Sequence, residues 1–283
     1  NADLLVTQDE RDDAVGKAVR IATLLQKAYW GTEDGPIPLL IVGSWGKNTQ
    51  VRPSNDIGIM IILPDAEFLR FNAYQSLKQS SLLQDVKGVI AKTYSQTTMR
   101  GDGQVVVIDF NSIKVEVVPV FSLRNGTYVM PDTRDGGIWK TVDPIAQIQR
   151  IEQIDVLSNR DSRPLTRMMK LWMRERNVPM KSFLLELMVA EFMRTYAFKD
   201  RGIFYYDWFV RDFLAFLIGY ENGHVIIPGT GEHIPLGREW LSRAETALAA
   251  ARLACEYERL DLIWHAGTEW QKIFGTRIPQ WTS

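Results

Sequence analysis

The 283-residue sequence is poor in cysteine and histidine, with one cysteine, Cys255, and three histidines. A single cysteine excludes an internal disulfide and fits a reducing compartment. So few thiol and imidazole side chains also argue against a structural zinc site. The fold must therefore be stabilised by its hydrophobic core rather than by cross-links.

The sequence also lacks a net charge and a long apolar run. Its formal charge of −1 gives no overall basic field, so we expect no long nucleic-acid partner and only a local site for any polyanion. No apolar run approaches the roughly 18 residues that a membrane helix needs, and no signal-peptide pattern opens the sequence. We therefore expect a cytoplasmic protein without membrane contact.

What is present is typical of a soluble globular protein, with 46% hydrophobic and 24% charged residues. The length suffices for one large domain or two intimately joined ones. Local patterns predict a mixed α/β first half and a helical second half, with the boundary near Asp143. In the first half they predict helices over 8–28 and 66–83 and a further helix over 86–92. They also predict strands over 39–42, 57–63, 104–110 and 113–121, and a turn-rich segment over 125–143. In the second half they predict helices over 164–176, 182–197, 205–217, 239–258 and 266–274, with a loop or small hairpin over 225–236.

The loop between the first two predicted strands carries groups that suit a magnesium-bound triphosphate. A glycine lets a ligand approach the backbone closely, while hydroxyls, cations and a carboxylate can contact phosphates or a metal. These residues are Gly43, Ser44, Lys47, Thr49, Arg52 and Asp56.

A second carboxylate, Glu116, lies inside the otherwise apolar strand IKVEVVPVF. Alternation along the strand places Lys114, Glu116 and Val118 on one face. Burying this carboxylate costs free energy unless a cation or hydrogen bonds compensate its charge, and a metal ion would do so. The alternatives are a loop-end cap at Asp56 and an ordinary edge-strand charge at Glu116.

The motif GSWGKNTQVRPSND…IILP resembles the signature of polymerase-β-like nucleotidyltransferases. More narrowly, it resembles the bacterial cGAS/DncV-like nucleotidyltransferases (CD-NTases), which are related to oligoadenylate synthase and cyclic GMP-AMP synthase. The resemblance implies a two-lobed α+β fold. The lobes would be a nucleotidyltransferase core over residues 1–143, with a mixed sheet and helices, and a helical oligoadenylate-synthase-like lobe over 144–283.

A second block, RPLTRMMKLWMRERNVPMKSFLLELMVAEF, resembles a family segment in which a lysine and a serine contact the donor phosphates. The resemblance assigns these roles to Lys170 and Ser182, with Arg167 as a lesser candidate. A helix N-terminus at Ser182 would favour an anion. The alternatives are that Ser182 only caps its helix and that Lys170 is a surface lysine with a buried stem.

The resemblance also implies two metal ions, roughly 3.5–4 Å apart, and assigns Asp56 and Glu116 as catalytic metal ligands. The family pattern Asp-x-Asp reads Asp56-Ile57-Gly58 here, so the second carboxylate is missing. Asp109 shares the face of Glu116, but pairing with Lys114 is the favoured interpretation.

Two further segments extend the resemblance to roughly Asp9–Pro279. Trp139 and the closing Trp270-Gln-Lys-Ile-Phe274-Gly are expected to be packing residues, as is Trp172. The aromatic run from Phe204 to Phe209 is expected to pack helices rather than to stack a base.

The implied activity is synthesis of a cyclic di- or trinucleotide second messenger from ATP and other nucleoside triphosphates, with Mg²⁺ or Mn²⁺ and release of pyrophosphate. The implied setting is bacterial anti-phage signalling, with a regulatory protein encoded nearby as a partner. One alternative is a nucleotide-binding pseudoenzyme disabled at Gly58. Another is an RNA-tailing enzyme, which the near-neutral charge disfavours.

Overall fold

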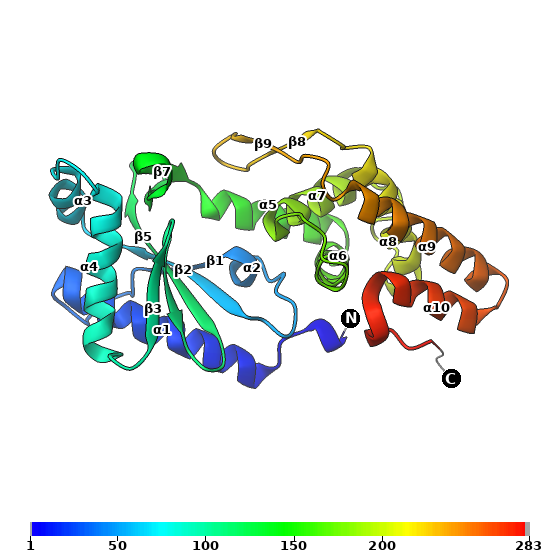
Figure 1. The fold of residues 1–283 in the computed structure, drawn as a ribbon, viewed down its shortest axis with the longest axis horizontal. Helices are drawn as coiled ribbons and strands as arrows, with labels where there is room; N and C mark the ends of the chain where they lie inside the picture. The colour runs from blue at the N-terminus through cyan, green and yellow to red at the C-terminus, as the bar shows by residue number, and fades with distance from the viewer. Residues whose placement is uncertain (1, 281–283) are drawn as a thin grey trace. The chain divides into compact units, whose positions relative to one another are not determined.

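A computed structural model of the protein describes residues 2–280 and shows two compact units (Figure 1). The N-terminal unit is Leu5–Ile148, and the C-terminal unit begins at Gln149 and includes the short 3₁₀ helix η1 (Ala2–Leu4). The division falls within helix α5 (Pro144–Leu157), which begins directly after the predicted boundary at Asp143. A mixed unit followed by a helical one confirms the predicted α+β class and its two lobes.

Seven strands form one sheet in the described part of the N-terminal unit, in the order β1-β2-β5-β4-β3, with β6 pairing with β5 and β7. Only β2 and β5 run parallel among these pairs. The strands are β1 (Leu39–Val42), β2 (Asp56–Ile62), β3 (Thr98–Asp102), β4 (Val105–Asp109), β5 (Lys114–Ser122), β6 (Tyr128–Asp132) and β7 (Ile138–Val142).

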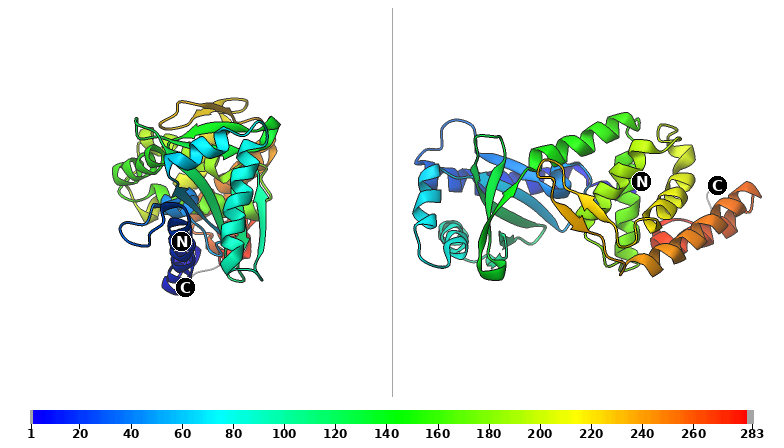
Figure 2. Two further views of the ribbon diagram at one scale, coloured as in Figure 1. Left: turned by 90° about the vertical axis from the view of Figure 1, so that its left-hand side faces the viewer. Right: turned by 90° about the horizontal axis from the view of Figure 1, so that it is seen from above.

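Helices α1 and α4 cover one face of this sheet (Figure 2). Alternate residues of β2, such as Ile57 and Ile59, point into this core and are fully buried. Trp139 packs against Phe68 and Phe121, with ring centroids 5.2 and 5.9 Å away, as predicted. The helices of the unit are α1 (Gln8–Trp30), the single turn α2 (Gly43–Gly46), α3 (Asp65–Asn72) and α4 (Lys78–Thr93), with the 3₁₀ helix η2 (Arg134–Gly136).

The N-terminus of α1 has the predicted capping box. The Glu10 amide donates to the Thr7 hydroxyl at 3.2 Å, and the Thr7 amide donates to the Glu10 carboxylate at 2.7 Å. Two otherwise unpaired amides are therefore satisfied, which fixes where the helix begins.

Three local predictions for this unit were wrong. The helix expected over 66–83 is two helices, because the chain turns at Leu77, which has a left-handed backbone with φ of 56°. No glycine or proline marks that turn. Strand β3 was missed because its sequence, TMRGD, is an exposed edge without apolar alternation. The turn-rich segment 125–143 contains the hairpin of β6 and β7.

The C-terminal unit is helical, with one small hairpin. Trp172, Trp270 and Phe274 are buried, which confirms their predicted packing role, and Phe209 is fully buried whereas Phe204 is 91% exposed. None of the helices in residues 2–280 is long and apolar enough to cross a membrane. The elements after α5 are α6 (Ser162–Glu175), α7 (Ser182–Thr195), η3 (Ile203–Tyr205), α8 (Tyr206–Ile218), β8 (His224–Ile226), β9 (His233–Pro235), α9 (Leu241–Arg259), α10 (Ile263–Phe274) and η4 (Gly275–Arg277).

Candidate active site

The two predicted metal ligands lie on one face of the sheet. Strands β2 and β5 are parallel neighbours, with Asp56 beside Lys114 and Gly58 beside Glu116. Residues paired in this way project to the same face, and the intervening residues project into the buried core on the other. Asp56 is exposed and Glu116 half-buried. The topology therefore brings together two carboxylates that are 60 residues apart in sequence.

The electrostatics of this face favour a bound cation. Burial raises the pKa of Glu116, and the charges of Asp56 and Asp102 raise it further, while Arg100 and Lys114 oppose this rise. Since the two carboxylates repel each other, a divalent ion between them would remove the repulsion and compensate the burial. Asp56 and Glu116 therefore fit the oxygen donor set that Mg²⁺ or Mn²⁺ prefers.

The carboxylate missing from the Asp-x-Asp pattern corresponds to Gly58, an open position on the same face. The three atoms nearest to a Cβ built on Gly58 would all belong to Val42, with its side chain at 3.4 Å and its carbonyl oxygen at 3.8 Å, both ordinary contacts. Gly58 is also not among the glycines with a positive φ. An aspartate at this position would therefore lie beside Glu116 without backbone strain.

Asp109 is held in an ion-pair cluster rather than standing free beside Glu116. It lies opposite Lys114 in the ladder, with 3.6 Å between Lys114 Nζ and Asp109 Oδ1. Arg100 Nη1 donates to Asp109 Oδ2 at 3.0 Å. The favoured interpretation, pairing with Lys114, is confirmed.

The loop between β1 and β2 is anchored by Trp45, a residue that the sequence analysis did not single out. Its indole Nε1 donates to the backbone oxygen of Asp56 at 2.7 Å and to Ser54 Oγ at 3.1 Å. Trp45 is buried in the one-turn helix α2. It therefore ties the Gly-Ser segment to the residue that begins β2, and the aromatic position of the motif was the available signal.

Of four other predicted loop residues, two are at least partly exposed to solvent and two are buried. Gly43 is exposed, with φ of 64°, and Ser44 is half-buried. Lys47 and Thr49 are buried, and the Thr49 amide donates to the Ser44 carbonyl oxygen at 2.8 Å. In this conformation Lys47 and Thr49 belong to the interior of the loop, and their contact with phosphate remains a prediction.

The predicted phosphate-binding residues of the C-terminal unit lie on α6 and α7. Lys170 on α6 forms an ion pair with Glu186 on α7, and the two side chains are 9% and 2% exposed. The alternative of a surface lysine is therefore wrong. Glu186 was missed as a site residue because its partner lies 16 residues earlier, on another helix.

Ser182 is exposed and is the first residue of α7. The N-cap position is Lys181, so the alternative that Ser182 caps this helix is also wrong. Arg167, the lesser candidate, is buried. The predicted phosphate contacts of Lys170 and Ser182 remain predictions.

Comparison with known proteins identifies the relatives of this chain. Residues 1–155 match the model of the Second Messenger Oligonucleotide or Dinucleotide Synthetase domain (SMODS). Over 167 residues the chain is 26% identical to the cyclic AMP-AMP-AMP synthase of an Acinetobacter species. The aligned region covers 58% of this chain and 48% of that relative. The chain thus spans about half the length of this curated relative.

Solved structures share the fold over almost the whole chain. Escherichia coli MS115-1 CdnC with ATP has a TM-score of 0.70 at 16% identity, covering 98% of this chain and 95% of that one. Vibrio cholerae DncV cyclic AMP-GMP synthase, in complex with a linear intermediate, has a TM-score of 0.73 at 14% identity. The match covers 98% of this chain and 92% of that one. The predicted two-lobed nucleotidyltransferase fold is thereby confirmed. With the SMODS match over more than half of its length, the chain belongs to the SMODS family of bacterial CD-NTases.

Proposed function

We propose that the protein is a nucleotidyltransferase that joins nucleoside triphosphates into a cyclic di- or trinucleotide second messenger and releases pyrophosphate. The observation that carries the proposal is the pair of carboxylates, Asp56 and Glu116, on one face of two parallel strands in a SMODS domain. Membership of the family and the synthase activities of the Acinetobacter and Vibrio relatives support the reaction type.

Each residue has a defined part in the proposed reaction. Asp56 and Glu116 would hold Mg²⁺ or Mn²⁺, which activates a ribose hydroxyl and neutralises charge on the triphosphate. Ser44 would contact the phosphates through its hydroxyl, and Lys170 and Ser182 would orient the β- and γ-phosphates of the donor. Attack of the hydroxyl on the α-phosphate forms the new phosphodiester bond and expels pyrophosphate.

Two finer points belong to the same proposal. The chain retains two of the three family carboxylates, so we infer that its basal activity is weak. We also infer that it acts in the bacterial cytoplasm, in anti-phage signalling, with a regulatory protein partner. The structure of CdnC in complex with HORMA-deltaN, which covers all of this chain with a TM-score of 0.69 at 17% identity, supports such a partner.

A product assay tests the proposal through Glu116→Gln. The chain is incubated with all four triphosphates and Mg²⁺ or Mn²⁺, and phosphatase-resistant products are separated by chromatography. Loss of a metal ligand should lower the rate at least about 100-fold, the scale of losing one group that stabilises transition-state charge. Glu245→Gln, at an exposed position on α9, is the matched control and should keep the wild-type rate.

One observation favours a second candidate function, a nucleotide-binding pseudoenzyme. Gly58 has no side chain beside Glu116, so the face lacks one of the metal ligands expected from the family pattern. This function predicts that the wild type binds ATP and forms no product. Product from the wild type excludes it.

A further inference from the structure

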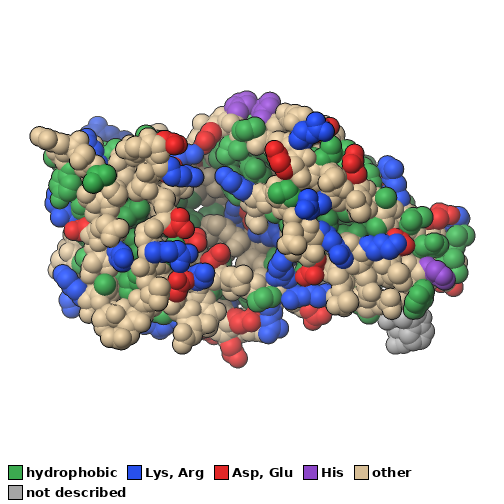
Figure 3. All heavy atoms as spheres, viewed as in Figure 1, with side chains coloured by type: hydrophobic (Ala, Val, Ile, Leu, Met, Phe, Trp, Pro, Cys, Tyr) green, Lys and Arg blue, Asp and Glu red, His purple; other side chains and the backbone are tan. Residues whose placement is uncertain are grey.

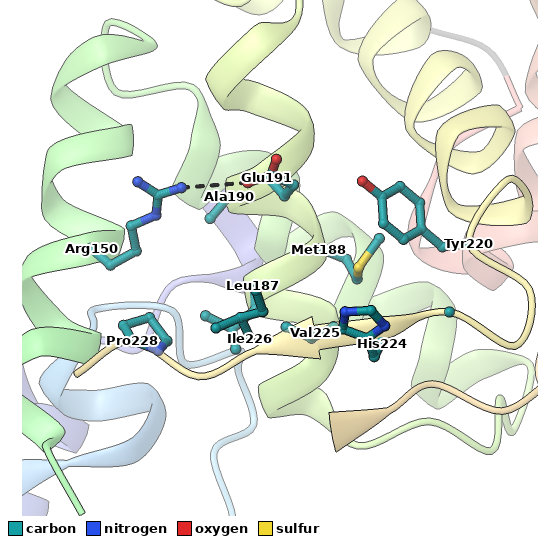
Figure 4. A pocket seen from close by; sticks show the side chains of 11 residues that line it. Arg150, Leu187, Met188, Ala190, Glu191, Tyr220, His224, Val225, Ile226 and Pro228 are labelled. Carbon is teal, nitrogen blue, oxygen red and sulfur yellow. Dashed lines mark hydrogen bonds and ion pairs between the residues drawn. The ribbon is translucent and has the colours of Figure 1, made fainter. Parts of the chain in front are cut away.

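A pocket of about 630 Å³ lies within the C-terminal unit, and its lining includes neither Lys170 nor Ser182 (Figure 4). Leu187 and Met188 of α7 and Val225 and Ile226 of β8 give it an apolar lining. Small-molecule sites are typically pockets of about 300–1,000 Å³ with apolar walls and a few polar groups. Its size and lining are therefore those of a ligand site.

Helix α7 presents different faces to this pocket and to the proposed phosphate contact. Successive helical residues are rotated by about 100°, so Leu187 and Glu191 lie roughly opposite Ser182 around the axis. Glu186, which pairs with Lys170, also lies outside the lining of the pocket. The pocket is therefore a second site and not part of the proposed nucleotide contact.

The pocket contains an arginine whose donors are largely unused by the chain. Among the described residues Arg150 makes one long ion-pair contact, 3.4 Å from Nη2 to Glu191 Oε2. Glu191 is held more closely by Arg194, with Nη2 to Oε1 at 2.5 Å and Nε to Oε2 at 3.1 Å. Because Arg194 already compensates Glu191, the positive charge of Arg150 and most of its five N–H donors remain for a ligand.

Two further polar groups border the same space. Figure 4 shows the Arg150 guanidinium and the Tyr220 hydroxyl on either side of Glu191, with His224 at the β8 wall. The His224 ring lies 4.7 Å from that of His233, and both residues are exposed. Histidine side chains are visible at the surface in Figure 3. Arginine, a hydroxyl and an imidazole around an apolar floor suit an anion attached to an apolar body.

We propose that this pocket binds a small organic anion, a carboxylate or a phosphate carried on an apolar body. Arg150 pairs with the anion, because a guanidinium fork matches carboxylate and phosphate oxygens. The body of the ligand packs on Met188, Val225 and Ile226.

Three probes with one ring system test this site by calorimetry on the whole chain: 2-naphthoate, 2-naphthyl phosphate and the neutral 2-naphthamide. At least one anion should bind about tenfold or more tightly than the amide, the usual scale of a charge-assisted hydrogen bond. The anion that binds identifies the headgroup. Equal binding of all three probes, or no binding by either anion, overturns the proposal.

Two sets of variants make the test specific to the pocket. Arg150→Gln should abolish the preference for the anion, whereas Arg259→Gln, a surface control paired with Glu256, should keep it. Because Ile226 is 55% exposed, a charged side chain there need not be buried, so Ile226→Glu should weaken anion binding and Ile226→Lys strengthen it. Equal affinities in Arg150→Gln and Arg259→Gln, or in the two Ile226 variants, contradict the proposal. These measurements read binding alone and do not depend on nucleotidyltransferase activity.

Discussion

The pKa values of two glutamates on α9 are shifted in opposite directions by their immediate surroundings. Burial raises the pKa of Glu258 on α9, and the neighbouring Asp207 raises it further, while a hydrogen bond from Trp270 Nε1 at 2.7 Å opposes the shift. Two residues earlier, a hydrogen bond from Arg259 lowers the pKa of the exposed Glu256. One helix therefore carries two glutamates whose contributions to stability have opposite pH dependence.

The raised pKa of Glu258 predicts how Glu258→Gln changes the stability of the protein with pH. A carboxyl whose folded pKa is raised binds its proton more tightly when folded, so stability falls as pH rises from its ordinary 4.5 through the folded pKa. Removing the charge should therefore stabilise the protein at pH 7–8, by about 0.5–2 kcal/mol as for other stabilising substitutions. The gain should vanish near pH 4.

Urea unfolding at several pH values checks this prediction, with Glu256→Gln as the matched control. Because the pKa of Glu256 is lowered, its stabilising effect is present at neutral pH and fades as pH falls. Glu256→Gln should thus give no gain at neutral pH. A Glu258→Gln variant that is less stable than the wild type at pH 8, or whose gain is independent of pH, contradicts the interpretation.

At this same scale, the sequence allowed Asp56 and Glu116 to be named as candidates, because Asp56 ends a polar loop directly before an apolar strand and Glu116 interrupts an apolar strand. Trp45 and Glu186 could not be assigned in this way, since their roles depend on partners brought together by the fold. The Trp45 partner is a backbone oxygen eleven residues later, and the Glu186 partner lies on another helix. Such contacts cannot be predicted from the composition of the sequence or the spacing of its residues.

At the scale of elements, the indole of Trp45 helps to position the loop from β1 to β2. Trp45→Phe removes donation to the Asp56 oxygen and Ser54 Oγ while keeping most of the apolar bulk. Losing such a bond should lower the free energy of unfolding by about 1–2 kcal/mol. Since the loop carries Ser44 and leads to Asp56, we expect the rate of product formation to fall further than stability alone explains.

Trp240→Phe is the matched control for this prediction. Trp240 is also buried and donates to a backbone oxygen, that of Leu236 at 2.9 Å, but it lies in the C-terminal unit. Both variants should lose similar stability in urea unfolding, and only Trp45→Phe should lose activity. Equal activity in the two variants would show that the indole does not position the site.

The second element-scale prediction concerns the buried ion pair that joins α6 and α7. Removing one partner deprives the other buried charge of this ion pair, so Lys170→Met should cost about 3–5 kcal/mol. The double variant Lys170→Met with Glu186→Met should recover most of that stability, because an apolar pair can replace a buried ionic one. Urea unfolding measures both effects.

Nucleotide binding by the same double variant separates packing from function. If Lys170 contacts the donor phosphates as proposed, the double variant is stable but binds ATP at least about tenfold more weakly, the scale of a lost hydrogen bond to a charged group. Unchanged ATP affinity in the stable double variant would assign Lys170 to packing alone.

Elements with strong periodicity or capping signals were predictable, whereas those defined by long-range pairing were not. The capping box marked α1, and the alternation around Asn111-Ser112 marked the β4–β5 pair. The exposed edge strand β3 and the β6–β7 hairpin have weak local patterns, and the break between α3 and α4 lacks a glycine or proline. Their positions depend on partners in the sheet and the core rather than on local sequence.

At the scale of the whole molecule, the proposed reaction draws on both compact units. The carboxylates and the Gly43-Ser44 segment belong to the N-terminal unit, and Lys170 and Ser182 belong to the C-terminal unit. On the face shown in Figure 3, Lys and Arg side chains are interspersed with Asp and Glu. With a net charge of −1, this distribution favours small nucleotide substrates over a long RNA strand.

We propose that a two-metal carboxylate centre on β2 and β5 supports synthesis of a cyclic oligonucleotide, and that the missing carboxylate at Gly58 weakens this activity. The most direct test compares the wild type, Gly58→Asp and Gly58→Asp with Glu116→Gln in the product assay with all four triphosphates. We expect Gly58→Asp to make phosphatase-resistant cyclic product at least about tenfold faster than the wild type, because it adds a metal ligand. Adding Glu116→Gln should abolish that product. The claim is contradicted if folded, ATP-binding Gly58→Asp makes no cyclic product, or if product persists without the Glu116 carboxylate.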